Sequence, residues 1–445
     1  MNTAIDRVGE RRSLLSIGIL FFVFGFFTWL NSILIPYFRI ICEIGWFEAF
    51  LVTAAFYISY FLLAIPSALL LERISLIRGI LIGLGLIILG SLIFIPAAIY
   101  RSFPTFLIGL FLQGAGLTLM QTASNLYVTL LGSIESAAKR ISIMGIANKI
   151  AGALGGLILG GVLFGSNTAQ DISSHINQLS TADRIVYLDN LAHSIISPYL
   201  IMAICLIALM FIFYAMKPID TREKTKKQKY SFRGIPTHSW LGFIAIFLYV
   251  GAEVIAGDSS VAYAQTSNLQ PLKLCISNWC IDFSTPHYFT SYVMTGMIIG
   301  YLIGIVLIPK YISQEKMLML FSILGIAITI AILTLPRNIS VFAVPILGFA
   351  HSIMWPSIWP IAIRNSGDKA EIVSALLIMG IIGGAIMGPF FGWLSDKINM
   401  QYAYSILLIS YLYLIFYSRI GEKVKRRVGD LETGRLGDEV IGDSR

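Results

Sequence analysis

The side chains in this sequence that could do chemistry are ionisable residues inside long apolar runs. Lys149 and Glu253 each lie near the middle of a hydrophobic segment, and Asp258 follows Glu253 toward the end of the same segment. An ionisable side chain at the centre of a membrane-spanning helix costs about 2.5–3.5 kcal/mol on insertion scales, so it needs a partner, water or a cavity. We expect Glu253, Lys149 and Asp258 to couple an ion, with Asp258 close to external water. A structural pair explains Lys149 equally well.

Amide and indole side chains form a second group inside the apolar runs. Amides donate and accept hydrogen bonds at once, which suits sugar hydroxyls, and tryptophan offers a flat apolar face to a sugar ring. The candidate substrate-binding residues are Asn31, Gln121, Asn125, Asn148, Trp355 and Trp29. Hydrogen bonds between helices would explain the amides without a ligand. His351, on its own, is expected to be structural.

Motifs of enzyme catalysis and metal binding are absent from the sequence. It contains no GxxxxGK[ST] phosphate loop, no HExxH and no Cys/His set with metal-ligand spacing. ATP-driven transport by this chain is therefore excluded, and an enzyme is disfavoured. We expect no catalytic residue, no metal site and no cofactor, apart from a coupling ion that is a proton or sodium.

The composition shows which elements must position these residues. Of 445 residues, 57% are hydrophobic and 13% charged, and the mean hydropathy is +0.80. Soluble domains carry about 25% charged residues, so the bilayer is the solvent that suits this chain. Twelve spans need about 240 residues at roughly 20 residues each. The apolar runs predict spans near 13–38, 47–71, 79–100, 104–131, 141–165, 196–216, 238–264, 287–309, 317–335, 339–363, 371–394 and 402–418.

The basic residues orient these spans. If both termini are cytoplasmic, 25 of the 32 Lys and Arg residues fall on the inner side, which follows the positive-inside rule. The net charge of +8 is thereby explained without nucleic acid. We predict a multi-pass plasma membrane protein, in the inner membrane if the source is Gram-negative, with the lipid bilayer as its partner and a functional monomer.

The chain divides into two halves around a basic linker. We predict a cytoplasmic N-terminus over residues 1–12, six-helix bundles over 13–216 and 238–418, a linker over 217–237 and a disordered cytoplasmic tail over 419–445. A short surface helix is possible within residues 165–197. Cys275 and Cys280 share one external loop, where a disulfide and two free thiols are equally good expectations.

The two halves repeat one another. GAGLTLMQ begins at Gly114 and GFAHSIMW at Gly348, an offset of 234, and IMGI recurs at residues 143 and 378, an offset of 235. Such a parallel repeat of six plus six helices is how major facilitator transporters are built. Glycines at every fourth position in two spans predict smooth faces along which the halves could rock: Gly152, Gly156 and Gly160, and Gly380, Gly384, Gly388 and Gly392.

Several motifs resemble one branch of a known family. They are GFFTWLNSILIPYF (residues 25–38), AFYISYFLLAIPSALL (55–70), QTASNLYVTLLGSIESAAKRISIMGIANKIAG (121–152), FLYVGAEV (247–254) and SIMWPSIWPIAI (352–363). The sequence is similar over residues 13–418 to the glucose/galactose transporter branch of the fucose–galactose–glucose:proton symporter family. The resemblance implies an all-α membrane protein of the major facilitator fold, with twelve transmembrane helices in two six-helix repeats, that imports a hexose by alternating access.

The sequence also departs from the family. The fucose branch has carboxylates in spans 1 and 4 where this chain has Ser32 and Gln121, which leaves Glu253 as the leading acidic candidate. Leu126 stands where the glucose-like motif often has proline after Asn125. The alternatives are an uncoupled facilitator, a transporter of another small polar solute and a sugar sensor that does not transport.

Overall fold

The computed structural model describes residues 18–130, 134–165, 169–216, 234–267, 269–276, 279–308, 311–364, 366 and 369–432. Side chains at 72, 125–142, 169–170, 216, 273–281, 370–371 and 425–432 lie outside the description. Within this part of the chain, twelve helical spans are long and apolar enough to cross a membrane. The expected all-α membrane fold with twelve spans is confirmed.

The first half contains six spans. The first runs over Gly18–Ile41 and includes α2 (Asn31–Ile41). The others are α3 and α4 (Trp46–Ala49, Leu51–Arg73), α5 (Leu76–Ile99), α6 (Phe103–Leu130), α7 (Ile134–Phe164) and α10 (Ile196–Met216). Before α10 the chain forms two further helices, α8 (Ala169–Gln178) and α9 (Thr181–His193), where a short surface helix was expected.

The second half contains the other six spans. The seventh span is α11 (Thr237–Gln265), the eighth is η1 (Pro286–Tyr288) with α12 (Phe289–Leu307), and the ninth is α13 (Gln314–Thr334). The tenth span consists of α14 (Arg337–Ser340), η2 (Val341–Ala343), α15 (Val344–His351) and α16 (Met354–Ile363). The eleventh is α17 (Ala370–Met379) with α18 (Ile382–Lys397), and the twelfth is α19 (Met400–Ala403) with α20 (Ile406–Glu432). The tenth span is interrupted after His351 because Pro356 has no N–H for the Ser352 carbonyl.

Two short strands lie between α11 and α12. β1 (Lys273–Ile276) and β2 (Trp279–Asp282) pair antiparallel, with Cys275 directly opposite Cys280. The side chains of both cysteines lie outside the described residues, so the expectation of a disulfide stays untested. The hairpin is a small addition to a helical fold.

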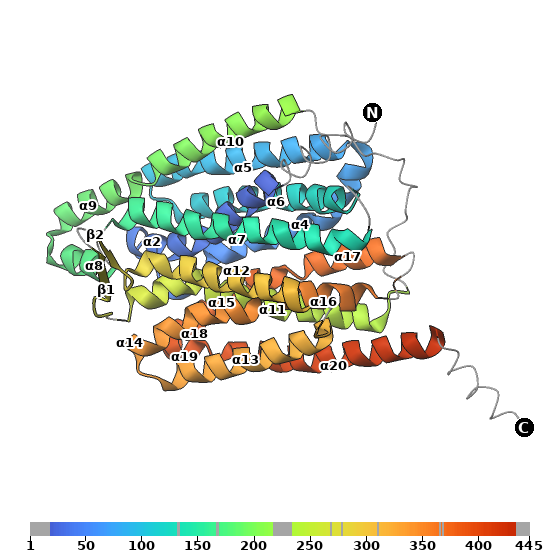
Figure 1. The fold of residues 1–445 in the computed structure, drawn as a ribbon. Coiled ribbons are helices and arrows are strands. Elements are labelled where there is room, and N and C mark those ends of the chain that lie inside the picture. The colour runs from blue at the N-terminus through green and yellow to red at the C-terminus, as the bar shows by residue number, and fades with distance from the viewer. Residues whose placement is uncertain are drawn as a thin grey trace, which may run out of the picture.

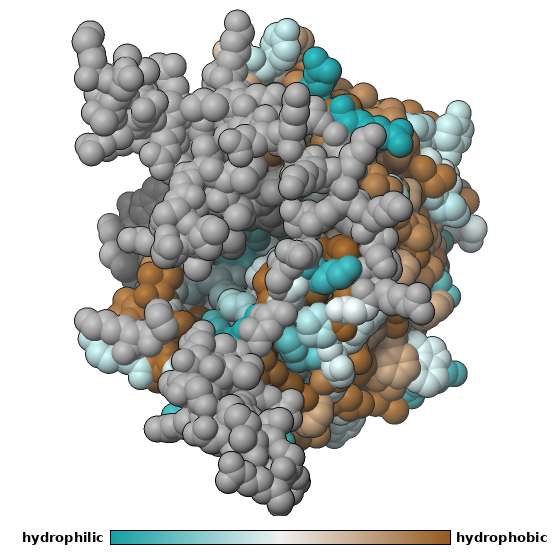
Figure 2. All heavy atoms as spheres, turned by 90° about the vertical axis from the view of Figure 1, so that its right-hand side faces the viewer, coloured by the Kyte–Doolittle hydropathy of each residue, from teal (hydrophilic) through white to brown (hydrophobic). Residues whose placement is uncertain are grey.

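We name the two ends of the bundle after the segments that lie there, the chain termini at one end and the β1–β2 hairpin at the other (Figure 1). The first span begins and α20 ends at the terminal face, whereas α8, α9 and the β1–β2 hairpin lie at the opposite hairpin face. Seen end-on, the terminal face shows hydrophilic side chains in a recess near its centre (Figure 2). Residues 1–12 and the first part of the predicted linker, residues 217–233, lie outside the described part.

The repeat predicted from Gly114 and Gly348 is present in three dimensions. A Cβ at Gly114, on α6, would lie 2.2 Å from the Phe56 carbonyl oxygen of α4. A Cβ at Gly348, on α15, would lie 2.2 Å from the Val293 carbonyl oxygen of α12. Each glycine therefore lets the fourth span of its half touch the second span of that half.

Most glycines of the two predicted stripes lie where the halves meet, but Gly152 and Gly380 face Trp29 and Ile246 of their own halves. On α7, Gly156 faces Thr290 and Gly160 faces His287 in the second half. On the eleventh span, the partners come from the first half: Gly384 faces Tyr57, Gly388 faces Thr53 and Gly392 faces Trp46. The interface thus includes two similar contacts of a small-residue face against a bulkier helix.

The last helix is longer than we expected. The sequence predicts a disordered tail from Arg419, but α20 continues to Glu432. The added residues, RIGEKVKRRVGDLE, are mostly good helix formers. Extending an existing helix also avoids the cost of nucleating a new one. Residues 433–445 lie outside the description.

Candidate functional site

An ion pair between the two halves forms the centre of the candidate site. The ammonium Nζ of Lys149, on α7, lies 2.8 Å from the Oε1 atom of Glu253, on α11. The two side chains are 9% and 12% exposed. Removing either charge would leave the other buried without a counterion, which is why such pairs are sensitive to single substitutions. The contact joins two residues that sequence analysis singled out separately.

Trp29 of the first span lies directly against this ion pair. Lys149 Nζ is 4.4 Å from the centroid of the Trp29 ring, within the range of a cation–π interaction. If Gly152 carried a Cβ atom, that atom would lie 2.4 Å from the Trp29 ring, and a Cβ atom at Gly257 would lie 2.1 Å from it, so a larger residue would not fit at either position. These two glycines on α7 and α11 therefore hold the indole between the halves.

A second buried polar group lies one and a half turns along α11 from Glu253. Asp258 is fully buried, and neither of its carboxylate oxygens has a hydrogen-bond partner. Asn31, also fully buried, places its amide within reach of this carboxylate, without a hydrogen bond of normal geometry. Our expectation that Asp258 lies near external water is wrong, because α2 packs across α11 and covers it.

Aromatic side chains line the second half beside Glu253. Tyr249 is one turn before Glu253, and its ring centroid is 6.3 Å from that of Trp355. Trp355 is half-buried and stacks on Trp359 with centroids 5.4 Å apart. His351 is buried and shares a hydrogen bond with the Tyr411 hydroxyl at 2.7 Å, as a structural histidine would.

The remaining amides differ in burial. Gln121 and Asn148 are half-buried, whereas Asn31 is fully buried. The Asn125 side chain lies outside the described residues. A Cβ at Gly25 would lie 1.8 Å from the backbone oxygen of Asn148, so the first span and α7 touch there. Among the predicted residues, the structure brings together Trp29, Lys149 and Glu253, and joins Asn31 to Asp258.

Two tyrosines near these carboxylates were missed by sequence analysis. Tyr57, on α4, is buried and interacts electrostatically with both Asp258 and Glu253. Tyr301, on α12, is buried and interacts with Glu253. A tyrosine inside an apolar run is a weak sequence signal of a buried polar contact, but it is the signal by which both residues could have been chosen as candidates.

The hairpin face is closed by a contact between the halves. The backbone N–H groups of Trp46 and Phe47 donate to Oδ1 and Oδ2 of Asp396, at 3.1 and 2.9 Å. Arg39 lies over the Trp46 ring, 4.3 Å from its centroid. A carboxylate at the end of α18 thus holds the start of the second span.

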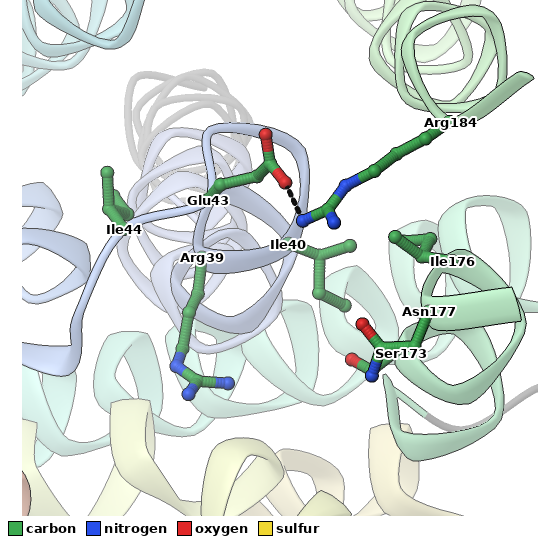
Figure 3. A pocket seen from close by; sticks show the side chains of 8 residues that line it. All are labelled: Arg39, Ile40, Glu43, Ile44, Ser173, Ile176, Asn177 and Arg184. Carbon is green, nitrogen blue, oxygen red and sulfur yellow. Dashed lines mark hydrogen bonds and ion pairs between the residues drawn. The ribbon is translucent and has the colours of Figure 1, made fainter. Parts of the chain in front are cut away.

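A small pocket at the hairpin face is separate from this site (Figure 3). Its volume is about 240 Å³, and its lining residues are Arg39, Ile40, Glu43, Ile44, Ser173, Ile176, Asn177 and Arg184. Figure 3 shows Arg184 reaching across to Glu43, with which it forms an ion pair. None of the residues predicted for substrate or ion lines it.

Comparison with known proteins agrees with this architecture. The chain is 32% identical over 418 residues to a glucose/galactose transporter of Brucella abortus, covering 92% of this chain and 94% of the relative. It is 28% identical over 409 residues to the L-fucose-proton symporter of Escherichia coli, covering 90% and 91%. The crystal structure of a variant of the E. coli fucose:proton symporter, FucP, superposes with a TM-score of 0.68 at 25% identity, covering 92% of this chain and 98% of that one.

The family model of the Major Facilitator Superfamily matches residues 19–380. With twelve spans in two similar halves, this multi-pass membrane protein belongs to the Major Facilitator Superfamily, in the group that contains the glucose/galactose transporters and the fucose–proton symporters.

Proposed function

We propose that this chain is a secondary transporter that imports a monosaccharide of the glucose/galactose type, coupled to protons or sodium. The observation that carries the proposal is the buried polar contact between the halves, where Lys149 pairs with Glu253 beside Trp29. Ionisable groups at the middle of a membrane bundle mark ion and substrate pathways. The names of the relatives, a glucose/galactose transporter and an L-fucose-proton symporter, point to a sugar as the substrate.

The sugar would lie between the halves, with amides on one side and indoles nearby. We assign substrate contact to Asn31, Gln121, Asn125, Asn148, Trp355 and Trp29. The half-buried Gln121, Asn148 and Trp355 are accessible without rearrangement of the core. Ion coupling is assigned to Glu253, Lys149 and Asp258, because they are ionisable groups buried where the two halves of the bundle meet.

The orientation follows from the basic residues. We place the terminal face in the cytoplasm and the hairpin face outside, since 25 of 32 Lys and Arg residues are then cytoplasmic. In this orientation the contact of Asp396 with Trp46 and Phe47 closes the outer side. The glycine stripes on α7 and α18 let the halves rock, so that the site opens to one side at a time. We infer a functional monomer in the plasma membrane, with both termini inside.

Uptake into proteoliposomes tests the proposal. Purified protein should exchange radiolabelled glucose or galactose for unlabelled sugar across the membrane, and an imposed proton or sodium gradient should drive accumulation. A protein that exchanges no hexose would overturn the sugar assignment. Exchange without accumulation in either gradient would identify an uncoupled facilitator, whereas saturable binding without exchange would identify a sensor.

A further inference from the structure

The least compensated polar group in the described part of the interface is Asp258. It is fully buried, both carboxylate oxygens lack hydrogen-bond partners, and no described Lys or Arg forms an ion pair with it. An ionised carboxylate in such surroundings is strongly disfavoured and takes up a proton instead. Glu253 is different, because Lys149 Nζ contacts it at 2.8 Å.

The neighbour of Asp258 suits a protonated acid. Asn31 is fully buried beside it, and both polar atoms of its amide lack a hydrogen-bond partner. A carboxylic acid and a primary amide are complementary, since the acid O–H can donate to the amide oxygen while the amide N–H donates to the acid carbonyl. An ionised carboxylate can only accept, so it could use the amide N–H but would leave the amide oxygen without a donor.

Resting on the transport function proposed above, we propose that Asp258 and Asn31 form the proton-binding pair of this transporter, with Asp258 holding the coupling proton. The titratable groups that interact with Asp258 are Glu253 on its own helix and Tyr57 on α4. Lys149 on α7 is occupied by Glu253, and α2 contributes the neutral Asn31. The ion pair and the proton site are thus separate parts of one polar cluster.

The position of the pair connects protonation to rocking of the halves. Asn31 belongs to α2 in the first half, and Asp258 to α11 in the second, seven residues before that helix ends at the hairpin face. When the hairpin face opens, water separates the two residues and a hydronium ion gives its proton to an Asp258 oxygen, leaving water. When the face closes, the neutral acid is buried against Asn31. Release breaks the same O–H bond and passes the proton to water on the other side.

Transport with an imposed pH gradient is the first test. If one proton enters with each sugar, a difference of one pH unit across the membrane can drive about tenfold accumulation of the sugar. Asp258→Asn should abolish this accumulation while leaving hexose exchange detectable, and Asp183→Asn, at the exposed start of α9, is the matched control. Accumulation by Asp258→Asn equal to wild type would overturn the proposal. So would wild-type accumulation driven by sodium alone and lost in Asp258→Asn.

Infrared spectroscopy provides a readout that needs no substrate. Wild-type protein at neutral pH should show the C=O stretch of a buried protonated acid, and growth on ¹³C-aspartate should shift that band. The band should disappear in Asp258→Asn and persist in Glu253→Gln. A band that does not shift with labelled aspartate would overturn the proposal even if Asp258→Asn fails to fold. Because this measurement does not depend on hexose, it separates failure of the proton site from failure of the sugar assignment.

Discussion

Lys149 and Glu253, which are 104 residues apart in the chain, form a 2.8 Å ion pair that joins the two halves of the bundle. Each residue alone would be a costly charge inside the membrane. Together, with the Trp29 ring against the ammonium, they form a compensated unit. The pair therefore links α7 of the first half to α11 of the second half in this conformation.

The ion pair predicts non-additive effects on stability. Lys149→Gln and Glu253→Gln should each lower the thermal unfolding midpoint in detergent, since removing one partner of a buried pair costs about 3–5 kcal/mol. The double variant should be more stable than the sum of the single changes implies, because no charge is left unpaired. Asp189→Asn, which breaks a partly exposed contact with Arg101 at the hairpin face, is the control and should change stability less than either single variant. Strictly additive effects would show that the pair does not form.

Sequence alone indicated that Lys149 and Glu253 each need a partner, because the cost of a charge inside an apolar run depends only on the run. The sequence left open whether the two side chains meet, because that depends on how the two halves of the bundle pack together. Asp258 shows the same limit more strongly. Its position near the end of a span suggested water, whereas the structure buries it where α2, which carries Asn31 227 residues earlier in the chain, packs on α11.

The helical architecture was more predictable than the site. Spans follow from local hydropathy, and the repeat follows from offsets between Gly114 and Gly348. The hairpin-face contact could not be foreseen, since Asp396 reads as an ordinary charged residue at the end of a span. Its role depends on two backbone N–H groups, and because almost every residue has such a group, the sequence does not indicate which ones Asp396 binds.

The proposed orientation predicts the labelling of the linker. Lys226→Cys, in the basic segment outside the described residues, should resist a membrane-impermeant maleimide in intact cells and react in inverted vesicles. For this and every other cysteine-labelling test, the native Cys42, Cys205, Cys275 and Cys280 are first replaced by serine, so that the introduced cysteine is the only thiol in the chain. Reaction of Lys226→Cys in intact cells would reverse the orientation.

The assigned sugar contacts predict a modest loss of affinity. Removing one hydrogen bond to an uncharged hydroxyl costs on the order of 0.5–1.5 kcal/mol, about three- to tenfold in dissociation constant. Gln121→Ala and Asn125→Ala should weaken hexose binding by this amount, measured by calorimetry on purified protein, without a change in thermal stability. Gln113→Ala, at a buried position elsewhere on α6, is the control for binding. Unchanged affinity in both variants would assign the two amides to packing between helices.

The closure at Asp396 predicts a shift between conformations. Asp396→Ala removes two hydrogen bonds from the backbone of Trp46 and Phe47, so the hairpin face should open more often. Loss of about 1.4 kcal/mol would shift the equilibrium tenfold, and one hydrogen bond to a charged acceptor contributes about 1.5–3 kcal/mol. Thr53→Cys reports on this opening, because Thr53 is fully buried against Gly388 of α18. Labelling of that cysteine by an impermeant maleimide in intact cells should accelerate about tenfold in the Asp396→Ala background and remain slow with Asp183→Ala. Equal rates in the two backgrounds would mean that other contacts, such as the glycine stripes, hold the face closed.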